Sequence, residues 1–396
     1  MSSPTEFRRY DYYALLAFAF TAVASIAFQN LIWVSIALFL FLRLTRPGKI
    51  NWPSNLFAAA TILFLATFII GALLGVNPSK SFETVHKYLT FLVIFPLGAM
   101  ALSLLDVRKL LHFFIAGAWV CAVYGIGKHF LLNQDRIDSF SGDKMVFGGM
   151  LMASLLIVTF LLKSSPKNPW LWLSLAVIGT ALIFTGTRGA WVGALAGSFF
   201  LMRGLSKRYL WGGVLILICL FFLLPSQYQD RIKSITDIHY SYTINMMDKA
   251  DNGKIANASQ PRLLIWASGL KMIRDFPLGV GQGNVEDVYP RYRIPTNDSE
   301  PTVPHLHDNF LQIAAQNGWL GFAVYLFWIF AFYHDALRFK PSGPEADQWN
   351  WMFLSVFTAI WVWGLTEYTF SHQFMNIQFF LLGLQTNLWL QKPQTN

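Results

Sequence analysis

Residues 56–74 read LFAAATILFLATFIIGALL and contain no charged side chain. A helix needs about 20 consecutive apolar residues to cross about 30 Å of hydrocarbon. Inside lipid, every backbone N–H and C=O group must be paired within its own segment, so a run of this kind adopts an α-helix. We therefore predict a transmembrane helix over residues 55–75, and this segment decides the fold class.

The same signal recurs along the chain. Hydrophobic residues make up 55% of its 396 residues and charged residues only 13%, whereas a soluble domain carries about 25% charged residues. The apolar runs are continuous and lack the alternation of membrane barrel strands. We predict an all-α, polytopic integral membrane protein with about twelve transmembrane helices. They lie near residues 12–28, 30–44, 55–75, 88–105, 110–132, 146–162, 169–185, 189–203, 209–224, 318–336, 350–367 and 373–390.

A long polar segment interrupts this helical pattern. Residues 1–224 hold the first nine predicted helices, residues 225–317 form a large loop, and residues 318–396 hold the last three helices. Within the loop, apolar residues recur at near-helical spacing over Arg262–Asp275, which predicts a short amphipathic helix. A loop of this length is usually either functional or disordered, and the embedded helix favours a functional loop domain.

The basic residues of the short loops predict the orientation. The net charge of +9 does not indicate a nucleic-acid partner, because many of these charges lie in short loops, where they set membrane topology. Placing the N-terminus in the cytoplasm puts most of them inside. We therefore predict that both termini are cytoplasmic and that the large loop is on the outer side. The short outer loops then hold Lys80, Lys87, Lys128, Arg136, Lys144 and Arg188.

The first polar feature on the outer side is the turn TGTRGAW, residues 185–191, between two apolar spans. Arg188 is costly there unless its side chain snorkels or pairs. Gly186 and Gly189 allow a backbone or a ligand to approach closely. Arg188 is either an interfacial anchor or part of a binding site, and its outer position, where topology disfavours a cation, favours the second interpretation.

The second polar feature is Arg262, which begins the amphipathic loop helix directly after Pro261. A cation at a helix N-terminus opposes the helix dipole. An anionic partner would resolve that conflict, and the alternative is a solvated charge beside a helix start.

The third polar feature is the segment HLHDNFLQ, residues 305–312, where the loop enters the next span. An imidazole with an unperturbed pKa of about 6.5 exchanges a proton near neutral pH. One alternative is an interfacial histidine with satisfied hydrogen bonds. Another is a metal site that uses His305, His307 and Asp308, which is disfavoured because the outer loop holds no further His or Cys beyond His239.

Two other motifs carry no function. The segment GVGQG, residues 279–283, is not a dinucleotide-binding fingerprint, because no βαβ unit surrounds it. The glycan-acceptor patterns at Asn257 and Asn297 are common by chance. Cys121 and Cys219 both lie within apolar runs and are interpreted as packing residues.

The polar motifs resemble the O-antigen ligase and polymerase superfamily of bacterial envelope glycosyltransferases. The similarity extends over about a third of the chain as specific motifs, and His307, Gly318 and Gly321 fit the spacing of the ligase signature. Asp308 departs from that signature, which has a neutral hydrogen-bonding side chain at this position. The matching segments are Thr187–Gly193, Pro261–Trp266, Phe276–Asn284 and His305–Gln312.

The resemblance implies a multi-pass enzyme of the bacterial inner membrane. It would transfer O-antigen polysaccharide from undecaprenyl diphosphate to lipid A–core at the periplasmic face, with no nucleotide sugar, cofactor or metal. The residues that carry over as catalytic are Arg188, Arg262 and His307. The candidate substrate-binding side chains in the same motifs are Trp191, Gln282, Asn284, His305, Asp308 and Gln312.

This chemistry suits the residue types. An arginine fork binds phosphate oxygens bidentately, so Arg188 and Arg262 are expected to hold the diphosphate. His307 is expected to accept the proton of the acceptor hydroxyl, and direct displacement would invert the anomeric centre. A polymerase or a protein-glycosylating ligase would differ in its acceptor. A lipid-linked glycan transporter would place ionisable residues at mid-membrane, and Glu367, near a span end, is the closest exception.

Overall fold

The computed structural model describes residues 4–22, 53–100, 102–140, 142–202, 260–294, 300–370 and 372–390. Over these ranges the chain is helical and contains no strand, which confirms the predicted all-α class. The elements before the large loop are α1 (Pro4–Thr21), α3 (Leu56–Leu74), α4 (Pro78–Val85), η1 (His86–Val93), α5 (Ile94–Ala99), α6 (Leu104–Leu132), α7 (Lys144–Ser164), α8 (Pro169–Thr185) and α9 (Arg188–Leu201). They are followed by α12 (Gln260–Asp275), α13 (Val285–Val288), η3 (Tyr289–Arg291), α14 (Asn309–Arg338), α15 (Pro344–Trp363) and α16 (His372–Leu390).

Four of the described helices are long and apolar enough to cross a membrane: α3, α6, α7 and α14. Two shorter apolar helices cover Tyr12–Thr21 and Pro169–Thr185. The protein is thus a helical membrane protein, as predicted. The count of twelve spans stays a prediction, because the spans expected at residues 30–44 and 209–224 lie outside the described residues.

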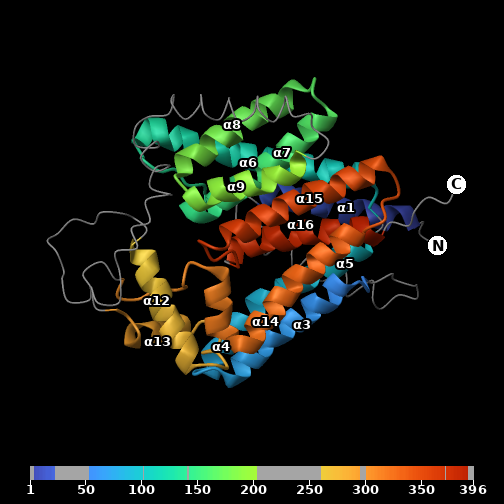
Figure 1. Ribbon diagram of the computed structural model, residues 1–396. Helices are drawn as coiled ribbons and strands as arrows, with labels where there is room; N and C mark the ends of the chain where they lie inside the picture. The colour runs from blue at the N-terminus through green and yellow to red at the C-terminus, as the bar shows by residue number, and fades with distance from the viewer. Residues whose placement is uncertain are drawn as a thin grey trace.

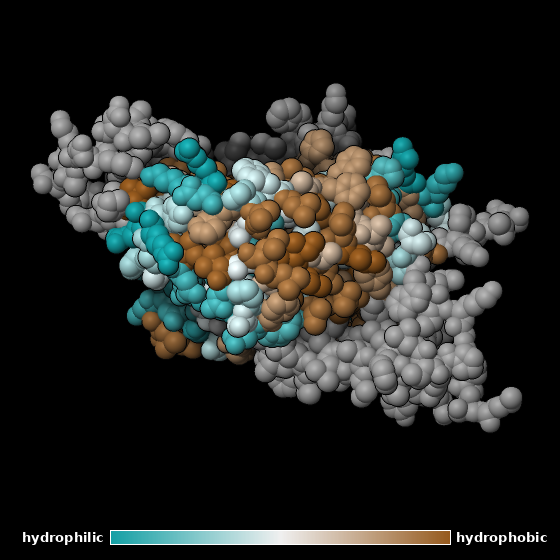
Figure 2. All heavy atoms as spheres, turned by 90° about the horizontal axis from the view of Figure 1, so that it is seen from below, coloured by the Kyte–Doolittle hydropathy of each residue, from teal (hydrophilic) through white to brown (hydrophobic). Residues whose placement is uncertain are grey.

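The long helices pack side by side in one bundle (Figure 1). Helix α15 packs against α9, α14 against α3, α16 against α5, and α7 against α8. Phe64 of α3 lies at the centre of an aromatic core, with ring centroids 5.4 Å from those of Tyr325 and Trp328 of α14. Large apolar side chains such as Ile62, Leu73 and Phe330 remain exposed. Figure 2 shows a broad apolar band flanked by polar groups, as lipid contact requires.

Helices α12 and α13 lie at one end of the bundle, and the start of α1 and the end of α16 lie at the opposite end (Figure 1). The segment from α12 to the start of α14, called the outer segment after its predicted side of the membrane, has a small core of its own, which includes Ile265, Val280 and Leu306. An ion pair of 2.7 Å between Lys80 and Asp287 joins α13 to α4. This ion pair adds to the packing of α12 against α14, which holds α12 against the bundle.

Several helix boundaries differ from the sequence-based prediction, and two of them have a clear local cause. The span expected at 88–105 is instead the 3₁₀ helix η1 followed by α5 and the first residues of α6. The capping box of Ser103 and Asp106 then begins α6 at Leu104. Helix α14 begins at Asn309, before the predicted residue 318, because the Asp308 carboxylate accepts a hydrogen bond of 2.8 Å from the Leu311 N–H.

Gly318 marks a kink inside α14 and explains the predicted boundary there. Its backbone has φ 66° and ψ −169°, which only glycine adopts readily. A Cβ atom at this position would lie 2.4 Å from the Pro277 carbonyl oxygen. The kink lets the glycine-rich loop after α12 pack directly against α14.

Candidate functional site

A cavity of about 320 Å³ opens where the outer segment meets the bundle. Its polar lining comes from five segments that are separate in sequence. All three predicted catalytic residues line it, together with three charged residues that were not predicted. The charged and titratable lining residues are Arg136, Arg188, Arg262, Glu300, His307 and Glu367.

Arg188 reaches the cavity from the start of α9. Gly186 ends α8 in the left-handed conformation with φ 63°, and Arg188 is the first residue of α9. The backbone N–H groups of a helix N-terminus favour an anion. A Cβ atom on Gly189 would lie only 2.3 Å from Thr366 Oγ1, so glycine allows this turn to contact the segment that carries Glu367.

Arg262 reaches the cavity from the first turn of α12, as predicted from its position. The Trp266 Nε1–H group donates a hydrogen bond of 3.0 Å to the Leu306 carbonyl, which joins α12 to the histidine segment. Arg262 Nη2 donates to Glu367 Oε2 over 3.1 Å. The guanidinium is therefore held in place at the cavity wall.

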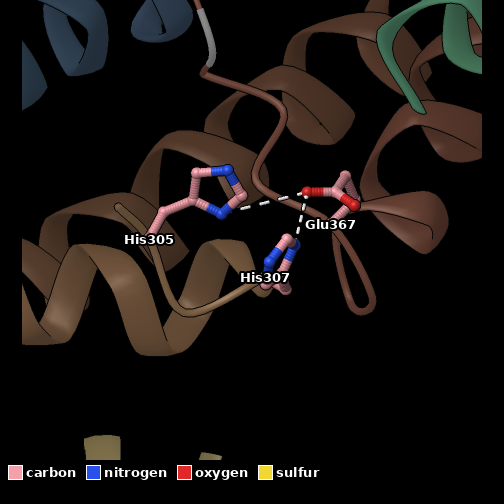
Figure 3. A group of neighbouring side chains, drawn as sticks. All are labelled: His305, His307 and Glu367. Atoms are coloured by element: carbon pink, nitrogen blue, oxygen red, sulfur yellow. Dashed lines mark hydrogen bonds and ion pairs between the residues drawn. The ribbon is translucent and has the colours of Figure 1, made fainter. Parts of the chain in front are cut away.

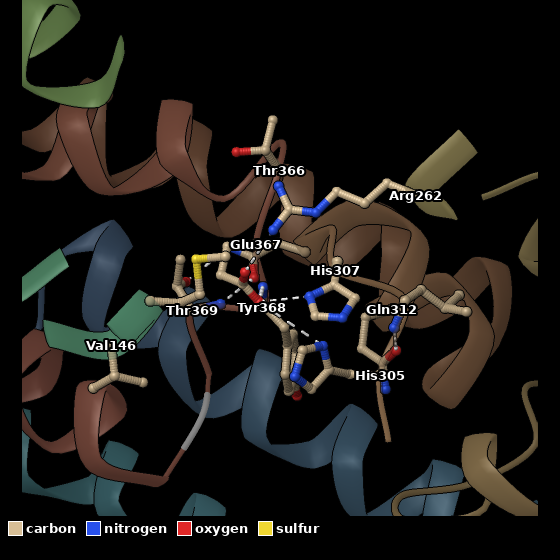
Figure 4. Close-up of polar contacts among 12 residues, drawn as sticks. Val146, Arg262, His305, His307, Gln312, Thr366, Glu367, Tyr368 and Thr369 are labelled. Atoms are coloured by element: carbon tan, nitrogen blue, oxygen red, sulfur yellow. Dashed lines mark hydrogen bonds and ion pairs between the residues drawn. The ribbon is translucent and has the colours of Figure 1, made fainter. Parts of the chain in front are cut away.

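His307 lies in the segment between η3 and α14 and has a left-handed backbone with φ 52°. This conformation is uncommon for a residue with a side chain and costs about 1–3 kcal/mol. The Leu306 N–H group donates to Gln312 Oε1 over 2.8 Å, and Asp308 caps α14, so both neighbours are fixed. His307 Nδ1 lies 3.0 Å from Glu367 Oε1 (Figure 4).

Glu367 contacts both His307 and Arg262, although the sequence alone did not predict it as a site residue. It lies after α15, is only 5% exposed, and contacts His307 through one carboxylate oxygen and Arg262 through the other. Burial raises its pKa, but the hydrogen bond from His307 and the nearby cationic groups, Arg262 among them, outweigh burial and leave the pKa lowered. Its one sequence signal was an acidic residue directly after an apolar span.

His305 lies beside this pair, and its ring centroid is 4.3 Å from that of His307. Its Nδ1 atom is 3.9 Å from Glu367 Oε1, too far for a hydrogen bond. Burial lowers the pKa of His305 to about 4, so the ring is neutral at physiological pH. One ligand atom each from His305, His307 and Glu367 lies within 4.8 Å of the others, and these are ligand types that Zn²⁺ accepts (Figure 3).

The other predicted substrate-binding residues do not line the cavity. Trp191 of α9 donates from Nε1 to the Leu182 carbonyl over 3.0 Å. Gln282 and Asn284 are buried in the glycine-rich loop; Gln282 donates to Asn317, and Asn284 donates to Ser81 Oγ over 3.0 Å. These contacts hold the loop against α4 and α14. Binding of substrate by these residues stays a prediction.

Asp308 and Gln312 hold the histidine segment through hydrogen bonds to its backbone and to the first turn of α14. Burial raises the pKa of Asp308 to about 6, although its backbone hydrogen bonds act in the opposite direction. Gln312 is fully buried and accepts from the Leu306 N–H group. Both side chains therefore set the position of His307, and direct contact of either with a sugar stays a prediction.

Arg136 is a further residue that sequence reasoning treated only as an outer-loop charge. It lies in the segment between α6 and α7, and its Nε–H group donates to the Thr185 carbonyl over 2.8 Å. This carbonyl is at the C-terminal end of α8, which favours a cation. Arg136 and Arg188 thus line the same side of the cavity, around the α8–α9 turn.

The fold and the site define a helical membrane protein whose cavity can bind an anionic group and accept a proton. Residues 173–326 match the family described as O-antigen ligase, which confirms the predicted resemblance to the O-antigen ligase superfamily. The matched segment contains Arg188, Arg262 and His307 but ends before Glu367. No curated protein matches the chain.

This family indicates a glycosyltransferase-type enzyme of O-antigen biosynthesis that is associated with a membrane. The partners it implies are a lipid-linked polysaccharide and membrane lipid.

Proposed function

We propose that this protein is an O-antigen ligase of the bacterial inner membrane. It transfers O-antigen polysaccharide from undecaprenyl diphosphate to a sugar of lipid A–core and thereby completes lipopolysaccharide. The observation that carries the proposal is the shared cavity: two guanidinium groups and an imidazole from three distant segments line it together. Both substrates are lipid-anchored, so a cavity where the outer segment meets the bundle suits them.

The donor's diphosphate is held by Arg188 and Arg262. As the glycosidic bond breaks, negative charge grows on the leaving diphosphate, and charge-assisted hydrogen bonds from guanidinium groups stabilise it. The first-turn N–H groups of α9 add positive potential on the same side as Arg188. Each charge-assisted bond contributes about 1.5–3 kcal/mol.

The acceptor hydroxyl is activated by His307. Its oxygen attacks the anomeric carbon, the bond from that carbon to the diphosphate oxygen breaks, and the hydroxyl proton passes to the imidazole. Undecaprenyl diphosphate leaves with the bonding electron pair. Because attack and departure occur on opposite faces, the anomeric configuration is inverted. No cofactor takes part in this sequence of steps.

The test is reconstitution of the purified protein in vesicles with lipid-linked polysaccharide and lipid A–core. The variants Arg188→Ala and Arg262→Ala are each expected to slow formation of the larger lipopolysaccharide by about 10- to 100-fold or more, as the loss of one charge-assisted bond requires. His307→Ala, which removes the base, is expected to slow it by about 10²- to 10⁴-fold. Arg108→Ala is the matched control, because Arg108 pairs with Glu345 outside the cavity. Parental rates in the three cavity variants would refute the assigned roles.

Acceptor identity separates the ligase from a polymerase and from a protein-glycosylating ligase. The His307, Gly318 and Gly321 spacing fits the ligase signature and therefore favours the ligase. Product that grows only on the lipid-linked repeat would instead identify a polymerase. Transport of lipid-linked glycan across vesicles with no new glycosidic bond would identify a transporter.

We also propose that the cavity faces the periplasm, with about twelve spans and both chain ends in the cytoplasm. The position of α12 at the end of the bundle opposite the start of α1 supports this orientation. Cysteine labelling in intact cells tests it. Accessibility of position 188 or 307 only from the cytosol would overturn both the topology and the catalytic assignment.

A further inference from the structure

The Glu367 carboxylate contacts both the proposed base, His307, and a proposed diphosphate-binding residue, Arg262. Oε1 contacts His307 Nδ1 at 3.0 Å, and Oε2 contacts Arg262 Nη2 at 3.1 Å. The Tyr368 N–H group also donates to Oε1 over 3.1 Å, which fixes the carboxylate. A carboxylate can only accept hydrogen bonds, so the His307 nitrogen that faces it carries the proton. The other ring nitrogen, Nε2, is then left as the base.

We propose that Glu367 is the positioning residue of the transfer reaction, fixing the tautomer of His307 and stabilising the imidazolium that forms during attack. This inference rests on the proposed function, because it assigns a partner to the proposed base. It follows the logic of carboxylate–histidine pairs, in which the carboxylate orients the ring without taking up the proton itself.

The second contact gives Glu367 an additional effect on donor binding. A diphosphate bound to Arg262 shares the positive charge of the guanidinium with Glu367, since Arg262 Nη2 already donates to the carboxylate. Donor binding therefore weakens the hold of Arg262 on Glu367 and leaves the full carboxylate charge to His307. The contact between Arg262 and Glu367 thus links binding of the donor to the basicity of His307.

The variant Glu367→Gln separates these effects, because glutamine keeps the side-chain size and removes the charge. We expect kcat to fall by up to about 10⁴-fold, the loss found when the carboxylate beside a histidine base is neutralised. The KM for the lipid-linked donor should stay equal or decrease, since Arg262 loses its competing anion. A collapse of the cavity would instead raise the KM together with the loss of kcat.

The pH profile provides a readout that a purely structural role would not change. Loss of a negative charge next to the imidazole should move the acidic limb of the kcat profile to lower pH by about 1–3 units. Glu367→Asp, which keeps the charge, should restore part of the rate and the parental limb. The other charged or titratable groups around the ring, unchanged in these variants, are His305, Asp308, Arg262, Arg188, Arg136 and Glu300.

Glu345→Gln is the matched control, because Glu345 forms an arginine ion pair of 2.8 Å with Arg108 outside the cavity. It should retain the parental rate. If Glu367→Gln does not fold, nitrogen-15 spectra of histidine-labelled parental protein still test the tautomer, with His307→Gln used for assignment. A proton on Nε2 instead of Nδ1 at neutral pH would overturn the proposal.

The remaining outcomes separate this inference from the proposed function. Loss of activity in His307→Ala, with an unchanged rate and profile in Glu367→Gln, would refute the positioning role alone. Parental activity in His307→Ala would refute the proposed base itself. Inactivation of the parental enzyme by a chelator and recovery with Zn²⁺ would show that Glu367 is a metal ligand with His305 and His307, and that outcome also overturns the proposal.

Discussion

Substitution of Gly189 by alanine tests how the catalytic segments are held together. A Cβ atom at this position would lie 2.3 Å from Thr366 Oγ1 and 2.9 Å from Trp363 Cδ1. Ordinary contact begins at 3.4 Å, so the start of α9 would have to move by about 1 Å away from the segment that carries Glu367. A misplacement of this size can lower the rate of a positioned reaction by about 10²-fold. Overpacking of this kind also costs about 1–3 kcal/mol of stability.

The assay measures transfer in vesicles and thermal unfolding in detergent on the same preparation. Gly127→Ala is the control: Gly127 lies in α6, and a Cβ atom there would meet nothing within 4 Å. That control should keep its rate and gain slightly in stability, since alanine favours a helix over glycine by about 0.5–1 kcal/mol. Adding Thr366→Ala to Gly189→Ala removes the nearest clash and should recover part of the rate. Parental rate and stability in Gly189→Ala would refute the contact between α9 and the Glu367 segment.

Two further predictions concern pH. Burial raises the pKa of Asp308 to about 6, so the folded protein binds this proton more tightly than the unfolded chain and stability falls as pH rises from about 4 to 6. Asp308→Asn, which keeps the helix cap, should therefore raise the unfolding temperature at pH 8 and not at pH 4. An equal change at both pH values would contradict the burial effect. Burial lowers the pKa of His305 to about 4, so the stability of the folded protein should fall as pH drops from about 6.5 towards 4. His305→Gln should remove this contribution to the acid destabilisation measured by thermal unfolding. An unchanged dependence of unfolding temperature on pH would show that the ring is not buried as described.

The fold class was predictable because lipid imposes one rule on every span. Uncharged runs such as residues 56–74 must be helices, and α3 matches its predicted range almost residue for residue. The boundaries that failed depend on local chemistry instead. Asp308 caps the N-terminus of α14 and so begins this helix earlier in the chain than predicted. The 3₁₀ conformation of η1 interrupts a run that hydropathy alone presents as one continuous span.

The candidate site was predictable only where a residue violated a local expectation. Arg188 in an outer turn, Arg262 at a helix start and the paired histidines each conflicted with topology or electrostatics, and three of these four side chains line the cavity. Arg136 and Glu367 gave weaker signals, because an arginine in a polar loop and an acid near a span end are ordinary. Their importance comes from the packing of distant segments, which a single sequence does not reveal.

Backbone geometry supports the same location independently of charge. Among the described residues, only Asn133 and His307 have positive φ without being glycine. Asn133 ends α6, where a left-handed asparagine is a common C-cap. His307 has no such local reason, and its backbone cost must be offset by the surrounding contacts. Strain of this kind gathers at sites where geometry serves function. A left-handed backbone that turns an imidazole towards a buried carboxylate is best explained by the need to hold the base in one orientation.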